Sequence, residues 1–207
     1  MSFKYYYTTP LIVIILSLAG LIDLIIDGLL FPLMKDANIE FLRAPGNASL
    51  IASFLLLYDR VLWKLPVFNL LVDVPNINGR YEGKVKYEFH GSPGETECFV
   101  EVKQTSSAIK VNSYFKNENK PSTNSKSLVE SIKKEDGFHS IYLYYFNNGS
   151  KENADLDCHE GANMLKFIPA HNNEPQKLIG HYFTNRKEQT RGIMEVEFKS
   201  KKLKGIF

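Results

Sequence analysis

The chain has 207 residues, of which 44% are hydrophobic and 23% are charged, and its formal net charge is +2. Most of its 25 Lys and Arg residues follow Pro75, where they are mixed with acidic residues rather than clustered. A protein that binds duplex nucleic acid concentrates basic residues on one surface, so we expect no duplex nucleic-acid partner. The change from an apolar to a charged composition predicts two regions, residues 1–74 and 75–207.

The first predicted element is an apolar stretch at residues 11–34, LIVIILSLAGLIDLIIDGLLFPLM. A helix crosses the hydrocarbon core of a bilayer with about 20 residues. The stretch therefore predicts a transmembrane helix. A cleaved signal peptide is the alternative, with its cleavage site at Ala19, but the apolar run continues well beyond that position.

A second apolar stretch, residues 48–72, also has spanning length and predicts a second transmembrane helix. Asp59 and Arg60 interrupt it, and the first stretch contains Asp23 and Asp27, one helical turn apart. In an antiparallel hairpin, position 23 lies roughly level with positions 59 and 60. Asp23 then neutralises Arg60, within one hairpin or between copies, or else Asp59 and Arg60 lie at the membrane boundary and reach water.

Both alternatives retain two membrane crossings, which place the N-terminus and the C-terminal region on the same side. Lys4 and the basic residues Arg80, Lys84 and Lys86 flank the crossings on that side. The positive-inside rule then favours the cytoplasm. We therefore predict a multi-pass membrane protein with its C-terminal region in the cytoplasm.

From Asn78 onward the hydrophobic period changes to two, which is typical of half-buried strands. The first strand is predicted at residues 79–89. Seven similar runs follow, separated by turn residues, at 97–105, 108–115, 127–134, 139–146, 163–168, 177–184 and 191–198. Eight short strands with short connections predict an antiparallel eight-stranded β-barrel, a lipocalin-like meander that encloses side chains or one small ligand. A two-sheet sandwich is the structural alternative.

Residue patterns typical of catalysis are not found in this strand-rich region. The five histidines have no metal-ligand spacing, and neither a Walker loop nor a G-x-S-x-G motif occurs. We therefore expect a protein that is not an enzyme and needs neither a cofactor nor a metal.

Residues suited to stacking on bases or binding phosphate lie near the predicted strand ends: Tyr81, Thr105, Tyr182, Thr184, Arg186 and Arg191. Arg191 is in phase with the outward Glu195 and Glu197, so it reaches the interior only from a strand end or a bulge.

Two apolar stretches followed by VPNINGRYEG, and strands that end in LIGHYFTNRKEQTRGIMEVEF, are similar to a known family. Two motifs carry the similarity: P-x-x-x-G-x-aromatic-x-G at Pro75 to Gly83, and G-x-Y-x-T at Gly180 to Thr184. Trp is common at the aromatic position of the first motif, where this chain has Tyr81. The chain resembles the two-transmembrane, β-strand-rich effectors associated with bacterial CD-NTases in cyclic-oligonucleotide-based antiphage signalling (CBASS).

The resemblance implies a barrel that binds a cyclic dinucleotide made by a partner CD-NTase after phage infection. Binding would drive oligomerisation of the transmembrane helices, disrupt the inner membrane and cause abortive infection. Ligand contacts are implied first for Tyr81, Thr105 and Arg191, and then for Tyr182, Thr184 and Arg186. Two other functions stay open: a tethered or secreted lipocalin-like carrier of a small hydrophobic ligand, and a membrane scaffold whose barrel binds another protein.

Overall fold

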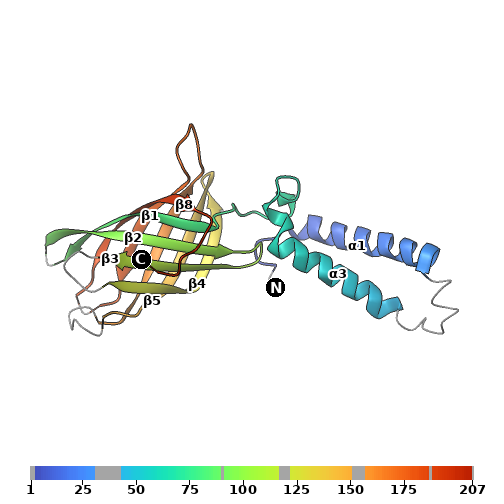
Figure 1. The fold of residues 1–207 in the computed structure, drawn as a ribbon, viewed down its shortest axis with the longest axis horizontal. Coiled ribbons are helices and arrows are strands. Elements are labelled where there is room, and N and C mark those ends of the chain that lie inside the picture. Colours follow the sequence, from blue (N-terminus) through green and yellow to red (C-terminus); the bar gives the residue numbers. More distant parts are fainter. Residues whose placement is uncertain are drawn as a thin grey trace. The chain divides into compact units, whose positions relative to one another are not determined.

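The computed structural model of the chain describes residues 3–30, 43–89, 91–116, 122–150, 157–186 and 188–206. The chain forms two compact units (Figure 1). The first comprises Met1–Asp73 together with Thr105–Ala108, and the second comprises Val74–Gln104 and Ile109–Phe207. Each unit is described by itself below.

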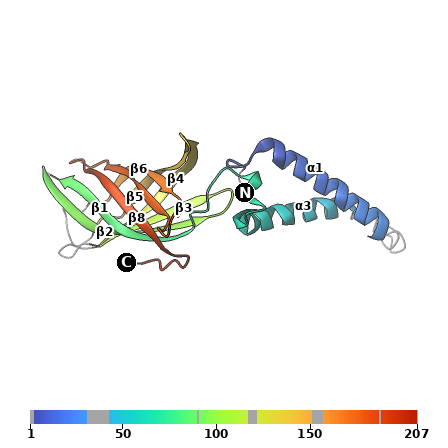
Figure 2. The same ribbon diagram turned by 90° about the horizontal axis from the view of Figure 1, so that it is seen from above.

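The first unit contains a helical hairpin, whose two arms are seen in Figure 2. Its elements are α1 (Thr8–Ile25), the π-helical turn η1 (Ile26–Leu30), α3 (Arg43–Arg60) and the 3-10 turns η3 (Leu62–Lys64) and η4 (Asn69–Leu71). The rings of Tyr6 and Tyr58 lie 5.8 Å apart beside the start of α1 and the end of α3. Near the other ends of the two helices, Asn47 donates a 2.7 Å hydrogen bond to Asp23. The two helices are therefore antiparallel.

Helix α1 with the start of η1, residues 8–28, is long and apolar enough to cross a membrane. Its apolar side chains are largely exposed, Leu24 by 71% for example, as expected of a helix that is not covered by protein. The last four residues of the predicted stretch, 31–34, lie outside the described residues. Among the helices that the structure describes, α1 alone meets this measure, so a second transmembrane helix is not confirmed.

The second helix differs from the predicted stretch 48–72 at both ends, because α3 begins at Arg43 and ends at Arg60. Beyond it the chain turns twice in 3-10 form, and Leu65 is extended. Leu65 precedes Pro66, and the ring of a proline disfavours helical geometry in the residue before it. Residues 61–72, nearly half of the predicted stretch, therefore do not continue the helix.

The hairpin places Asn47, not Arg60, opposite Asp23. Arg60 is exposed at the end of α3, roughly 20 Å further along the helix, so the expected Asp23–Arg60 pair does not form within one copy. Asp27 is exposed in η1.

Asp59 is buried rather than reaching water. It accepts hydrogen bonds from Ser106 Oγ at 2.7 Å and from the Ser107 amide at 2.9 Å, both within residues 105–108 of the same unit.

The second unit is a closed barrel of eight antiparallel strands, in which each strand pairs with the next and β1 pairs with β8. The strands are β1 (Gly79–Phe89), β2 (Ser92–Gln104), β3 (Ile109–Lys116), β4 (Thr123–Glu135), β5 (Phe138–Asn147), β6 (His159–Ile168), β7 (Lys177–Thr184) and β8 (Arg191–Ser200). Closure leaves no unpaired sheet edge. The predicted eight-stranded antiparallel barrel is confirmed, and the sandwich is excluded.

Two motif glycines are explained by close approach between strands. A Cβ atom on Gly83 would lie 2.1 Å from the Glu195 carbonyl oxygen, and one on Gly180 would lie 1.9 Å from the Met164 carbonyl oxygen. Any side chain at either position would push neighbouring strands apart. These glycines therefore shape the barrel wall.

The barrel interior is packed at one end. Tyr81, at the start of β1, is fully buried there, and its ring meets that of Phe198 edge-on at 5.7 Å. Val102 near the end of β2 and Leu178 near the start of β7 are equally buried. Because alternate strands run in opposite directions, these positions share one end of the barrel, and the opposite end is built from the other strand termini.

Candidate functional site: a polar cavity in the barrel

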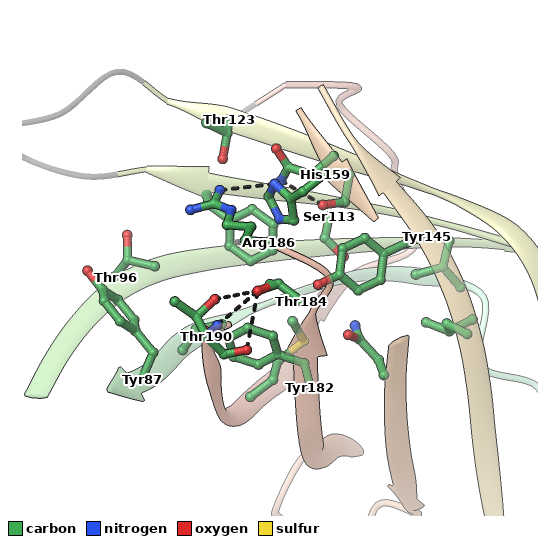
Figure 3. Close-up of a pocket in the computed structure, with 18 of the residues that line it drawn as sticks. Tyr87, Thr96, Ser113, Thr123, Tyr145, His159, Tyr182, Thr184, Arg186 and Thr190 are labelled. Carbon is green, nitrogen blue, oxygen red and sulfur yellow. Dashed lines mark hydrogen bonds between the residues drawn. The ribbon is translucent and has the colours of Figure 1, made fainter. Parts of the chain in front are cut away.

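The opposite end of the barrel interior contains a cavity of about 170 Å³ (Figure 3). Its walls come from the ends of β1, β3, β5 and β7 and from the starts of β2, β4 and β6, together with the segment that leads into β8. The side chains labelled in Figure 3 are mainly hydroxyl-bearing or aromatic: Tyr87, Thr96, Ser113, Thr123, Tyr145, His159, Tyr182, Thr184, Arg186 and Thr190. The lining also includes the apolar side chains of Val85, Val111, Leu143 and Met194, so the cavity combines hydrogen-bonding groups with apolar and aromatic walls.

Arg186, in the segment after β7, is the one permanently charged side chain among the described residues that line the cavity. Its Nη2 lies 3.0 Å from His159 Nδ1, whereas its buried Nε has no hydrogen-bond partner among the described residues. Burial lowers the pKa of Arg186 because it disfavours the charged form. A buried donor without an acceptor is destabilising, and a guanidinium in this position can donate to an external acceptor.

Two threonines hold the segment that carries Arg186. Thr184 Oγ1 and Thr190 Oγ1 are 2.9 Å apart, and the Thr190 amide donates to Thr184 Oγ1 at 3.0 Å. The Thr184 amide donates to the Thr190 carbonyl at 2.9 Å. These bonds close the connection between β7 and β8 and fix the backbone from which the Arg186 guanidinium projects into the cavity.

Three tyrosines, Tyr87, Tyr145 and Tyr182, give the cavity its aromatic surface. Burial raises the pKa of Tyr182 to about 12 and also raises that of Tyr145, so both phenols are neutral at physiological pH. Aromatic rings of this kind stack on nucleobases with about 1–3 kcal/mol per base. Deeper in the cavity the buried Asn163 Oδ1 has no partner among the described residues, and it can accept a hydrogen bond from a base amino group.

Residues 72–198 match the Cap15 cyclic dinucleotide receptor domain, and this match covers more than half of the chain. The chain belongs to the Cap15 family. It is 30% identical over 95 residues to the CD-NTase-associated protein 15 of Staphylococcus schleiferi. The aligned part is 46% of this chain and 49% of that protein, so the chain spans about half the length of this curated relative. These matches confirm the resemblance to CD-NTase-associated effectors.

The region that matches the Cap15 family contains the whole cavity and almost all of the barrel, whereas α1 and α3 lie outside it. In the part of the chain that the structure describes, no three His, Cys, Asp or Glu side chains are grouped as a metal site requires. The described residues that line the cavity instead present one guanidinium, one imidazole, two amides, hydroxyl groups, aromatic rings and aliphatic side chains.

Of the six predicted ligand residues, the structure brings together Tyr182, Thr184 and Arg186 at the cavity. Tyr81 points into the packed end, where its hydroxyl donates to the Ile77 carbonyl and accepts from Gln176. The remaining two, Thr105 and Arg191, do not line the cavity. Thr105 belongs to the first unit, and Arg191 is exposed on the outward face of β8, the face of Glu195.

Sequence reasoning missed His159, Tyr145 and Asn163. The predicted strand at 163–168 began four residues too late, because β6 starts at His159. Along β6 the buried positions alternate strictly from His159 to Phe167. Extending the period-two pattern backwards from Leu165 would have placed His159 and Asn163 on the inner face.

The two cysteines of the Cap15 barrel differ in exposure. Cys98 is buried in the interior, which raises the pKa of its thiol, and Cys158 is exposed directly before His159. Because the thiolate is the reactive form, we expect a maleimide to label Cys158 in the native chain and Cys98 only after unfolding. Mass spectrometry of the native and denatured protein would show one adduct and two, respectively. Labelling of a Cys158→Ser variant under native conditions would contradict this assignment.

Proposed function

We propose that this chain is a membrane-anchored receptor, not an enzyme, and that its barrel cavity binds a cyclic dinucleotide. The observation that carries the proposal is the buried, incompletely bonded guanidinium of Arg186 beside aromatic rings inside the barrel. A cyclic dinucleotide consists of two bases and two phosphodiesters. The tyrosines suit the bases, and the guanidinium suits a phosphodiester. Membership in a family described as a cyclic dinucleotide receptor domain supports the same ligand class.

The proposed role is that of a CBASS effector. A partner CD-NTase makes the ligand after phage infection, and ligand binding drives oligomerisation of α1 and α3 in the inner membrane. Disruption of that membrane then causes abortive infection. The length and apolarity of α1 support the membrane anchor. The proposed two-pass topology keeps the barrel in the cytoplasm, where the nucleotide is made.

A lipocalin-like carrier of hydrophobic ligands is the alternative. Ligand sites of that kind are predominantly apolar, whereas this cavity contains Arg186, His159 and Asn163 together with several hydroxyl groups. Desolvating these groups against an apolar ligand without hydrogen bonds would be unfavourable. The polar lining therefore supports the receptor.

The test is a thermal-shift series on the full chain in detergent, with cyclic di-AMP, cyclic di-GMP, cyclic GMP–AMP, cyclic UMP–AMP and a cyclic trinucleotide. A ligand present at about one hundred times its Kd adds about 2.7 kcal/mol to the free energy of unfolding, so we expect one cyclic dinucleotide to raise Tm clearly. The same nucleotide should release dye from liposomes that contain the protein. The linear dinucleotide and the mononucleotides serve as controls.

A well-folded chain whose Tm responds to none of these nucleotides would overturn the proposal. A rise in Tm with a fatty acid and with none of the nucleotides would favour the carrier instead. Nucleotide binding without dye release would retain the receptor and remove membrane disruption from its function.

A further inference from the structure

The charge of the cavity does not match the charge of the proposed ligand. This inference rests on the proposed function. Each of the two phosphodiesters of a cyclic dinucleotide carries one negative charge, whereas Arg186 is the one permanent cation among the described cavity-lining residues. A charge that is buried without a partner is strongly unfavourable. A second positive charge is needed, and the cavity contains one side chain that can gain it near neutral pH.

That side chain is His159, which is only 8% exposed. Its Nδ1 atom lies 3.0 Å from Arg186 Nη2 and also 3.0 Å from the Asp157 carbonyl oxygen. A guanidinium can only donate and a carbonyl can only accept. Nδ1 therefore bonds to Arg186 when it carries no proton, and to Asp157 when it does. The two contacts are alternatives, and the proton on Nδ1 decides between them.

The groups around His159 determine which form the empty cavity holds. Arg186 reaches it from the β7–β8 segment, Tyr145 from β5 contacts it with ring centroids 6.4 Å apart, and Tyr182 on β7 and Tyr87 on β1 line the same cavity. Burial lowers the pKa of His159, and the charge of Arg186 lowers it further, against the opposing effect of the Asp157 carbonyl. The neutral imidazole with its proton on Nε2 accepts a hydrogen bond from Arg186 at Nδ1 in the empty cavity.

The electrostatic balance changes once an anion binds to Arg186. The carboxylate of Asp157 also acts on that guanidinium, but a phosphodiester in direct contact neutralises its charge and takes over its hydrogen bonds. Arg186 then no longer requires Nδ1 as an acceptor, and it no longer disfavours a positive imidazole. A proton taken up at Nδ1 is donated to the Asp157 carbonyl oxygen, which already lies at hydrogen-bond distance.

We propose that His159 is the second anion contact of the site through its Nε2–H, and that it takes up one proton from solvent at Nδ1 when a cyclic dinucleotide binds. The site then presents two positive charges to two phosphodiesters. The pKa of His159 is higher in the complex than in the free chain. Affinity therefore rises as pH falls through the bound-state pKa, and it levels off below the free-state pKa.

The experiment is isothermal titration calorimetry of the full chain in nanodiscs, with the cyclic dinucleotide that gives the largest thermal shift. Titrations at one pH in HEPES and in Tris, whose ionisation enthalpies differ, give the number of protons exchanged. We expect uptake that approaches one proton per ligand. Between about pH 5.5 and pH 8.5, the association constant should increase by up to about tenfold for each pH unit of decrease.

His159→Gln keeps an acceptor for Arg186 but cannot gain a charge. We expect this variant to bind with no proton uptake and a flat pH profile, and to match the wild-type affinity only at the alkaline end. His181→Gln is the matched control, because His181 is exposed on the outer face of β7; its uptake and pH profile should equal those of the wild type. The two-buffer comparison on the wild-type chain needs no variant, so it remains decisive if His159→Gln folds poorly.

Binding to the wild-type chain without proton uptake would overturn this inference and leave the proposed function intact. Full uptake in His159→Gln would also overturn it, because the proton would then bind elsewhere. If none of the nucleotides binds, the proposed function fails, and the role of His159 fails with it.

Discussion

Replacing Arg186 with alanine is expected to weaken cyclic dinucleotide binding by about 100-fold or more. Removing one partner of a buried, charged hydrogen-bonded contact typically costs about 2–5 kcal/mol of binding free energy. Here it would leave one phosphodiester without its guanidinium partner. The affinity of Arg186→Lys should lie between those of the wild type and Arg186→Ala, because lysine retains the charge but cannot make the planar bidentate contact. Calorimetry on the full chain measures both variants.

Arg191→Ala is the matched control for this prediction. Arg191 is the other arginine singled out from the same part of the sequence, but it is exposed on the outward face of β8. We expect its removal to leave the affinity unchanged. If Arg191→Ala lost binding and Arg186→Ala retained it, the ligand site would lie outside the cavity. The Tm of each variant without ligand would show that both are folded.

The second large effect is expected at Arg80, on the outward face of β1. Although it faces away from the interior, Arg80 is only 1% exposed. Its Nε lies 2.8 Å from Glu82 Oε1, its Nη1 lies 2.9 Å from Glu101 Oε1, and Nη1 also donates to the Ile206 carbonyl at 2.7 Å. Its guanidinium lies over the ring of Phe99, 4.7 Å from the centroid.

Glu101 is the other half of this buried pair. Its carboxylate also accepts hydrogen bonds from the backbone amides of Lys204 and Gly205. The pair therefore holds the segment after β8 against the outer wall formed by β1 and β2. This arrangement explains why a charged pair on the outward face is buried.

Arg80→Ala is expected to lower the free energy of unfolding by about 3–5 kcal/mol, because it leaves the Glu101 carboxylate buried without its counter-charge. For a chain of this size, 1 kcal/mol changes Tm by about 2–4 °C, so the decrease should be about 6–20 °C. Thermal denaturation of the full chain in detergent, followed by circular dichroism, measures it. The cavity lies elsewhere in the barrel, so nucleotide affinity below Tm should remain.

Two further variants test the physical reason for this effect. Lys84→Ala removes another ion pair of β1, with Glu95, but Lys84 is 61% exposed, and we expect little change in Tm. Arg80→Met combined with Glu101→Leu removes both buried charges and should recover most of the lost stability. If Arg80→Ala were no more destabilising than Lys84→Ala, the buried pair would not stabilise the barrel.

The sequence alone was sufficient to predict the elements of the barrel. From Arg80 to Phe89 every second residue is charged, and this local pattern already separates the outer from the inner face. The phase of Arg191 with Glu195 likewise indicated the outward face, and the expected ligand contact of Arg191 from a strand end is not found. Periodicity is readable without a structure because successive side chains of a strand point to opposite faces whatever the rest of the fold.

Only the tertiary structure decided which end of the barrel is hollow. Tyr81 and Tyr182 both face inward, yet Tyr81 is packed against Phe198 and Tyr182 lines the cavity. A strand pattern distinguishes the two faces but not the two ends, since the free volume depends on side chains from all eight strands. His159 and Arg186 are likewise 27 residues apart in the sequence and meet because β6 and β7 pair antiparallel, which brings the start of β6 beside the end of β7.

In the helical hairpin, too, the local sequence predicted some features and only the tertiary contacts decided others. The composition of residues 11–34 indicated a membrane-spanning helix, because hydropathy is a sum over neighbouring residues. The sequence could not predict the partner of Asp23, because that partner depends on where α3 begins and ends. The helix ends at Arg60 rather than continuing to residue 72. The sequence thus determined the number and the faces of the barrel strands, together with the apolar helix α1. Long-range packing determined which side chains meet, because those contacts join residues that no local period relates.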